Sequence, residues 1–245
     1  MRTSRRAVVG LAGGLGVLVG QALIARRRNY LFDAAPGEMD GRFGAGDKHV
    51  HLVVIGDSTS VGVGAGSRAL SYPVLLARLL GRHLSVSLDV LGRSGVRMAD
   101  VAAELAPQAA SMRPDIVLIG VGVNDAIHLT PLPRLRAGLR KALETLLGAD
   151  VTTVVALGPR LDAPALPRPL RDLVAARCRA INRSLRRTAE AAGVAVVDVG
   201  ASVGDAFARD PGRYFCEDFF HPGPEGYALW ARAIEEPILR IALRV

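Results

Sequence analysis

The chain has 245 residues, half of them hydrophobic, and a formal net charge of +8. This length suits one well-packed domain with extensions, or at most two small domains, and the composition excludes a disordered chain. Six arginines lie before residue 29 with no acid among them, so the other 25 basic residues nearly balance the 23 acidic ones. Because the excess charge is confined to the N-terminus and no basic aromatic motif follows it, the sequence argues against nucleic-acid binding.

The N-terminal segment, residues 1–28, is predicted to be a membrane anchor or an export signal. Residues 7–25 contain no charged side chain. As a helix they would extend about 28 Å, close to the hydrocarbon thickness of a bilayer. Ser-Arg-Arg at 4–6 resembles the start of a twin-arginine signal, but no small-x-small cleavage site precedes Arg26. We therefore favour an uncleaved anchor over a cleaved signal or a buried soluble helix.

The next segment, residues 29–48, combines Pro36 with four glycines and several charges, which predicts a linker or surface wrap. The main domain is expected to cover residues 49–245, where strand-like and helix-like segments alternate. The expected strands are 50–55, 85–91, 115–120, 151–157 and 194–199. Four of them are nearly continuous apolar runs, as in a parallel sheet covered on both faces. The second alternates polar and apolar residues and is expected at an edge of the sheet.

Helical patterns fill the gaps between these strands, at 72–81, 97–110, 132–147, 168–192 and 224–243. The fourth has apolar residues at helical spacing and ends at Gly193, a residue typical of helix stops. The last begins at Pro224, and Pro237 is expected to kink or end it. Five strands and five helices in alternation predict an α/β fold, a three-layer α/β/α sandwich around a five-stranded parallel sheet of flavodoxin-like type.

The two cysteines, Cys178 and Cys216, are too few for a disulfide scaffold. We expect two free thiols, because buried cysteine usually behaves as a small hydrophobic residue, with a single bridge as the alternative. No CxxC motif or His/Cys cluster has the spacing of a metal site, and the five histidines are dispersed.

Four short polar motifs carry the chemistry: Gly-Asp-Ser at 56–58, Gly-Arg-Ser-Gly at 92–95, Gly-Val-Asn-Asp at 122–125 and Asp-Phe-Phe-His at 218–221. The first three follow predicted strands, so they share the carboxyl edge of the sheet, where reacting groups collect. The Ser58 hydroxyl becomes a strong nucleophile only if a base removes its proton. His221 is a candidate base, and Asp218 is placed to hold its other ring nitrogen.

Acyl transfer also develops a negative oxygen, which needs hydrogen-bond donors fixed in advance. The natural candidates are the backbone N–H groups of Ser58 and Gly95 and the side-chain amide of Asn124. Asp57 and Asp125, beside these groups, are expected to shape turns rather than to act in catalysis.

Together these motifs resemble those of the SGNH/GDSL hydrolase family, over about residues 49–245. The resemblance implies an α/β/α sandwich and ester hydrolysis through an acyl-serine, without a metal or organic cofactor. By this likeness Ser58 is the nucleophile, His221 the general base and Asp218 its partner, while Ser58, Gly95 and Asn124 form the oxyanion hole.

One feature departs from the family pattern. The second motif often carries an asparagine shortly before its glycine pair, where this chain has Val90 and Leu91. Since the contribution assigned to Gly95, rather than Gly92, is a backbone N–H, the departure concerns the loop geometry more than the chemistry.

The resemblance also implies a substrate class and a location. The expected substrates are acyl lipids or O-acylated glycans of the cell envelope, met by a catalytic domain outside the cytoplasm. Two other functions stay open: a flavodoxin-like phosphate-binding module using the loop at 56–62, and a catalytically silent envelope protein. The phosphate-binding interpretation leaves Asn124, Asp218 and His221 without a role.

Overall fold

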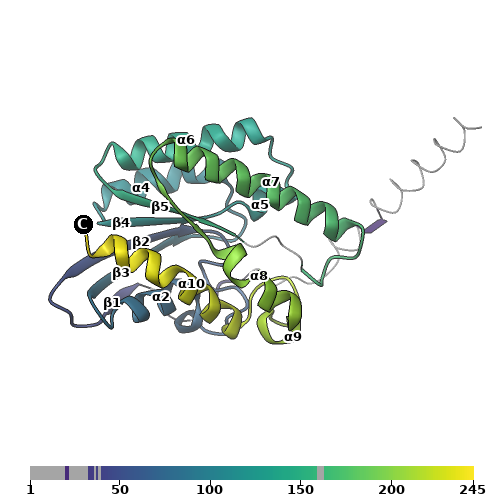
Figure 1. Ribbon diagram of the computed structural model, residues 1–245, viewed down its shortest axis with the longest axis horizontal. Coiled ribbons are helices and arrows are strands. Elements are labelled where there is room, and N and C mark those ends of the chain that lie inside the picture. Colours follow the sequence, from purple (N-terminus) through teal and green to yellow (C-terminus); the bar gives the residue numbers. More distant parts are fainter. Residues whose placement is uncertain (1–19, 22–32, 36, 38–39, 159–162) are drawn as a thin grey trace, which may run out of the picture.

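The protein, seen in a computed structural model, is described for residues 20–21, 33–35, 37, 40–158 and 163–245. A sheet with the strand order β1-β3-β2-β4-β5-β6 lies between two layers of helices (Figure 1). Five strands run parallel: β2 (His49–Gly56), β3 (Ser85–Gly92), β4 (Ile116–Gly120), β5 (Thr152–Leu157) and β6 (Ala195–Asp198). The α/β/α sandwich and its five parallel strands are therefore confirmed.

A sixth strand, β1 (Gly41–Phe43), was not predicted. It lies within the segment expected to be a linker and pairs antiparallel with β3. Three residues are too few to show the alternation of apolar and polar side chains by which a strand is predicted. The strand expected at an edge, β3, instead lies one strand inside it, because β1 pairs along its outer side.

Each face of the sheet builds its own core, because successive side chains of a strand point to opposite faces. Val53 and Ile55 of β2 pack in one core, while Leu52 and Val54 pack in the other. The helices that cover the first face are α4 (Ala106–Ser111), α6 (Leu132–Leu147) and α7 (Leu170–Ala191). Those that cover the second are α2 (Tyr72–Leu80), α8 (Val199–Arg209) and α10 (Pro224–Ala242). Burial on both faces explains the nearly continuous apolar strands.

Several helical segments escaped the sequence analysis. The largest is α8, which starts directly after β6, where the Asp198 side chain accepts a hydrogen bond from the Ala201 N–H at 2.8 Å. Pro237 lies inside α10 and does not end it. The other missed segments are short: η1 (Arg68–Leu70), α5 (Val123–Ile127) and α9 (Pro211–Tyr214). The helix predicted at 97–110 is present as α3 (Met98–Asp100), η2 (Val101–Leu105, a π-helix) and α4 in succession.

The predicted N-terminal anchor falls almost wholly outside the described residues, which include only Gly20 and Gln21 of it. The part of the chain that is described contains no helix with the length and hydropathy to cross a bilayer. The Gln21 side chain donates a hydrogen bond to the Arg168 carbonyl and accepts one from the Leu170 N–H at 3.1 Å. Residues 20–21 therefore lie beside the start of α7 (Figure 1).

One buried hydrogen bond gives a stability prediction. Tyr227 of α10 is fully buried, and its hydroxyl donates to the carbonyl of Val63, itself fully buried, at 2.6 Å. Tyr227→Phe leaves that carbonyl without a donor, so we expect the free energy of unfolding to fall by about 1–3 kcal/mol. The measurement is a denaturant titration. Tyr214→Phe is the control, because no hydrogen bond is found for its hydroxyl among the described residues; equal stability of the two variants would contradict the prediction.

Candidate active site

The turn after β2 presents Ser58 at the carboxyl edge of the sheet. Asp57 shapes this turn: its Oδ1 accepts from the Thr59 N–H at 3.0 Å and from the Thr59 hydroxyl at 2.9 Å. The Ser60 hydroxyl donates to the Asp57 carbonyl at 2.7 Å. A Cβ at Gly56 would lie 2.5 Å from the Ser60 Cβ, so only glycine permits this return of the chain. Burial raises the pKa of Asp57, and its bonds from Thr59 oppose that rise.

A second loop brings His221 to the same place. Residues 215–222 fold back on themselves, with the Cys216 N–H donating to the His221 carbonyl at 2.9 Å and the Phe219 N–H to the Cys216 carbonyl at 3.0 Å. Phe219 occupies the left-handed region, with φ of 52°. The loop leads directly into α10, whose packing in the core fixes its position.

The two loops meet in a chain of hydrogen bonds. The Ser58 Oγ lies 3.1 Å from the His221 Nε2, and the His221 Nδ1 lies 2.7 Å from the Asp218 Oδ2. An ionised carboxylate only accepts hydrogen bonds, so Nδ1 carries the proton and Nε2 faces the serine hydroxyl as an acceptor. The side chains of His221 and Asp218 are only 6% and 1% exposed. The structure therefore places all three predicted catalytic residues in the order that proton transfer requires.

Asp218 accepts hydrogen bonds from other groups besides the His221 ring. Its Oδ1 accepts from the Phe220 N–H at 2.8 Å, the His221 N–H at 2.9 Å and the Cys216 thiol at 3.0 Å. Burial alone would raise the pKa of this carboxyl, but the hydrogen bonds from His221 and Cys216 and from these backbone groups outweigh it and hold the pKa well below its usual range. The carboxylate therefore stays charged at neutral pH and keeps the imidazole in one tautomer.

The loop after β4 carries Asn124 within α5. One N–H of its amide donates to the Val96 carbonyl at 3.0 Å, in the loop that follows β3. Asp125 makes a parallel connection, since its Oδ2 accepts from the Met98 N–H at 2.9 Å. An amide has two N–H groups, so one orients Asn124 while the other remains for an oxyanion. Burial raises the pKa of Asp125, which acts here as a brace between loops.

The two glycines of the second motif play different parts. Gly92 is the last residue of β3 and pairs with Gly56 of β2. A Cβ at Gly92 would lie 2.4 Å from the Ser60 Oγ, so glycine is required there for packing. Gly95 lies in the loop that follows, exposed, with φ of 85° and open space around it.

The cysteines are both free. Cys178 is buried in the core beneath α7, as its spacing predicted. Cys216 contacts the Asp218 carboxylate, which the sequence analysis missed. Burial, together with that carboxylate, raises the pKa of Cys216 to about 12. No sequence pattern predicts a contact between Cys216 and Asp218, because this contact depends on how the loop at 215–222 folds back.

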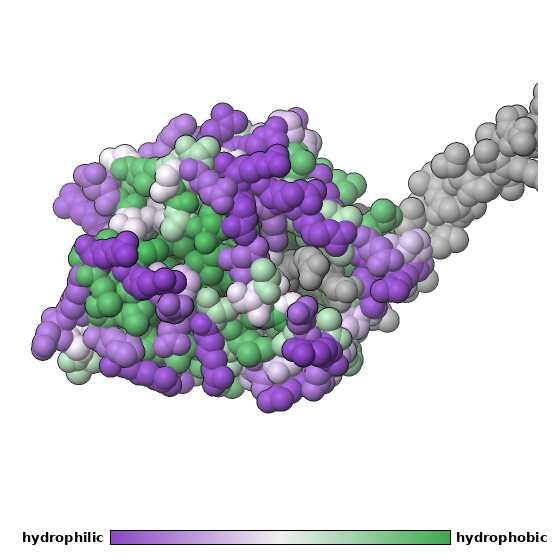
Figure 2. Space-filling view, in the orientation of Figure 1, coloured by the Kyte–Doolittle hydropathy of each residue, from purple (hydrophilic) through white to green (hydrophobic). Residues whose placement is uncertain are grey.

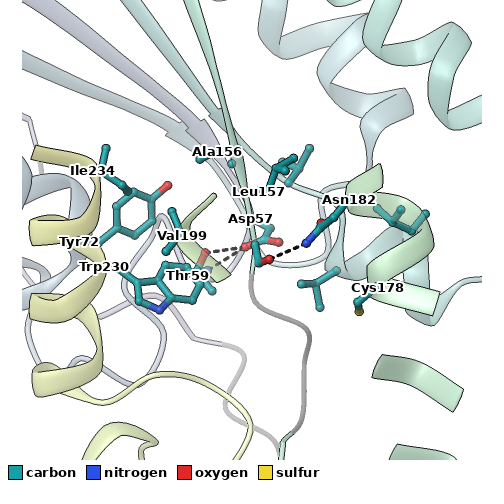
Figure 3. Close-up of a pocket in the computed structure, with 16 residues that line it drawn as sticks. Asp57, Thr59, Tyr72, Ala156, Leu157, Cys178, Asn182, Val199, Trp230 and Ile234 are labelled. Atoms are coloured by element: carbon teal, nitrogen blue, oxygen red, sulfur yellow. Dashed lines mark hydrogen bonds between the residues drawn. The ribbon is translucent and has the colours of Figure 1, made fainter. Parts of the chain in front are cut away.

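A small cavity of about 40 Å³ lies beside the nucleophile turn (Figure 3). Asp57 and Thr59, which flank Ser58, border it, as do Gly122 and Val123, which precede Asn124. Its other walls come from side chains to which the sequence analysis gave no role in the site: Tyr72, Ala156, Leu157, Cys178, Ile181, Asn182, Val199, Trp230 and Ile234. No group of three metal-binding side chains occurs among the described residues.

Comparisons with known proteins agree with this geometry. The sequence model of the GDSL-like Lipase/Acylhydrolase family matches residues 54–229, a stretch that contains every predicted site residue. A curated GDSL-like esterase of Mycobacterium tuberculosis is 29% identical over 247 residues, covering 95% of this chain and 77% of that protein.

Two solved structures share the fold. A lipolytic protein of the G-D-S-L family from Veillonella parvula has a TM-score of 0.63 at 18% identity, covering 78% of this chain and 98% of that one. A family 3 carbohydrate esterase from Clostridium thermocellum has a TM-score of 0.62 at 23% identity, covering 79% and 98%. The resemblance inferred from the four motifs is thus confirmed, and the chain belongs to the GDSL-like lipase/acylhydrolase family of ester-bond hydrolases.

Proposed function

We propose that this protein is a serine esterase in which Ser58 forms an acyl intermediate. The observation that carries the proposal is the chain of hydrogen bonds from the Ser58 Oγ through His221 to Asp218. In the first step the hydroxyl proton passes to the His221 Nε2 while Oγ bonds to the ester carbonyl carbon. The carbonyl oxygen becomes negative and is stabilised by the Asn124 amide and by the N–H groups of Ser58 and Gly95.

The protonated imidazole then gives its proton to the leaving alcohol, and the ester C–O bond breaks. Water attacks the acyl-serine by the same route, with His221 again taking a proton and returning it to Ser58. Asp218 stabilises the imidazolium in both halves of the reaction. Apart from water, both steps of the reaction use only the side chains and backbone N–H groups already named.

We further propose a short acyl group on an envelope lipid or glycan as the substrate. The cavity bordered by the chain neighbours of Ser58 and Asn124 has room for roughly three water-sized groups, and its walls are mainly apolar, which suits a short acyl chain. The carbohydrate esterase among the structural neighbours supports a glycan as the alcohol part. The uncharged residues 7–25 support an anchor that holds the catalytic domain outside the cytoplasm.

The nucleophile is tested by Ser58→Ala. Because no other hydroxyl is hydrogen-bonded to His221 in the described part of the chain, kcat for a soluble acetyl ester should fall by about 10⁴-fold or more. Labelling by a fluorophosphonate should disappear as well. Ser111→Ala, at an exposed position on α4, is the matched control and should keep both activities. Persistent labelling of the Ser58→Ala variant would exclude Ser58 as the nucleophile.

Asn124→Ala tests the oxyanion hole. We expect kcat to fall by about 10²- to 10³-fold with little change in KM, because the amide stabilises charge that appears only in the transition state. Steady-state kinetics on the acetyl ester measure both constants. An unchanged kcat, with chemistry rate-limiting, would remove Asn124 from this role.

The cysteines provide a test of the nucleophile's identity. Burial raises the pKa of Cys216 to about 12 and that of Cys178 to about 11, so both thiols stay protonated at pH 7.5. Since the thiolate is the reactive form, ester hydrolysis should survive incubation with iodoacetamide, and mass spectrometry should find both cysteines unmodified in the folded protein. Rapid alkylation of Cys216 with loss of activity would contradict this expectation.

A further inference from the structure

Apolar side chains gather around the edge of the sheet that carries Ser58 and His221. We call four of them the apolar rim: Ile127, Leu129, Leu173 and Phe219, which are 45%, 71%, 52% and 41% exposed. Half of the large exposed hydrophobic residues in the described part of the chain belong to it. Leu129 follows Asn124 by five residues, and Phe219 precedes His221 by two. The rim therefore borders the active site.

Two members of the rim are held outward at a conformational cost. Leu129 and Phe219 have φ angles of 53° and 52°, in the left-handed region that large side chains rarely occupy. An exposed leucine in that conformation gains nothing from the core and loses backbone stability, whereas asparagine or glycine would avoid the cost. Such a residue is explained if its side chain has a partner outside the chain.

Backbone contacts join the segments that carry the rim. The Arg177 guanidinium of α7 donates to the Thr130 carbonyl, next to Leu129. The Ala165 N–H donates to the Phe219 carbonyl at 3.2 Å, which ties the His221 loop to the segment leading into α7. Leu173 lies in the first turn of α7. These bonds hold the segments that carry the rim next to one another.

The N-terminal segment reaches the same surface. Gln21 is hydrogen-bonded to the Arg168 carbonyl and the Leu170 N–H, within one turn of Leu173. Gln21 belongs to the uncharged run at 7–25, and it contacts the folded domain at the active-site edge. Figure 2 shows hydrophobic side chains among polar ones on this side of the domain.

We propose that the apolar rim rests on a phospholipid bilayer, so that the active site opens toward the membrane surface. This inference rests on the proposed anchor and narrows the proposed substrates to esters held at that surface. A lipid surface suits the rim because its members are apolar and exposed, and because Gln21, which contacts the domain beside them, belongs to an uncharged run of 19 residues, long enough as a helix to span a bilayer. The charged groups at the start of α7 have partners within the protein: Arg168 pairs with Asp172 at 3.5 Å, and Arg171 donates to the carbonyls of Leu166 and Pro164 at 2.8 Å. The proposed contact is therefore attributed to the apolar side chains of the rim.

The contact is tested by placing a fluorophore on the rim of the full-length protein. Leu129→Cys labelled with an environment-sensitive dye is compared with Leu243→Cys, an equally apolar position 57% exposed at the end of α10. The native thiols are protonated at pH 7.5 and stay unlabelled. In phosphatidylcholine vesicles the dye at 129 should shift to the blue and be quenched by bromine-labelled lipid, while the dye at 243 should not. The same response at both positions, at neither, or a shift at 129 that depends on protein concentration without vesicles would overturn the proposal.

A kinetic comparison separates this proposal from the esterase assignment. Leu129→Asn with Leu173→Gln removes the apolar character while Asn suits the left-handed backbone, so the variant should fold. Hydrolysis of the acetyl ester of a long-chain alcohol embedded in vesicles should fall at least about 10-fold, a loss of about 1.4 kcal/mol of transition-state stabilisation, while hydrolysis of a soluble acetyl ester stays unchanged. Leu147→Gln with Leu243→Gln is the matched control and should change neither. Equal losses in both double variants overturn the proposed contact, whereas a wild-type protein inactive on every ester overturns the esterase assignment and leaves the fluorescence result to decide the contact.

Discussion

The close approach of two loops is the constraint on which the active site depends. A Cβ at Gly64, in the loop after Ser58, would lie 2.7 Å from the Pro222 carbonyl and 2.8 Å from the Cys216 Sγ, and Gly64 has a φ of 85°. Only glycine avoids these close contacts and adopts this φ without strain. This contact and the bond from the Tyr227 hydroxyl to the Val63 carbonyl set the separation of the loops. The 3.1 Å distance between the Ser58 Oγ and the His221 Nε2 follows from that separation.

Between these two loops, the Asp218 carboxylate fixes the orientation of the His221 imidazole. One oxygen faces the imidazole, and the other accepts two backbone N–H groups and the Cys216 thiol. A carboxylate held by four donors cannot rotate, so the imidazole that it orients cannot rotate either. The stabilisation of the charged form also offsets the cost of burying a side chain only 1% exposed. Local hydrogen bonding thus supplies the preorganisation that acyl transfer requires.

The sequence predicted those features that hydrophobic patterns and short motifs determine. Four of the five parallel strands appeared as apolar runs because helices cover both faces of the sheet. The motif at 56–58 predicted the candidate site from its place at a strand end, and the motif at 218–221 from the spacing of Asp218 and His221. The strand β1 and helix α8 were missed, since three residues carry no period and α8 begins without a loop after β6. The contact of Cys216 with Asp218 was missed for another reason: it depends on the closure of one loop, which no spacing encodes.

The parallel topology also bears on how substrate reaches the site. Since every parallel strand delivers its loop to the same edge, the donors, the nucleophile and the cavity must all open in one direction. Whatever lies on that side determines which esters the enzyme meets. Gln21 is hydrogen-bonded to the domain on this side. Leu129 adopts a left-handed backbone conformation there and is 71% exposed. In the proposed function, the small cavity beside the nucleophile turn limits the size of the acyl group, and the apolar rim sets the surface from which the ester is taken.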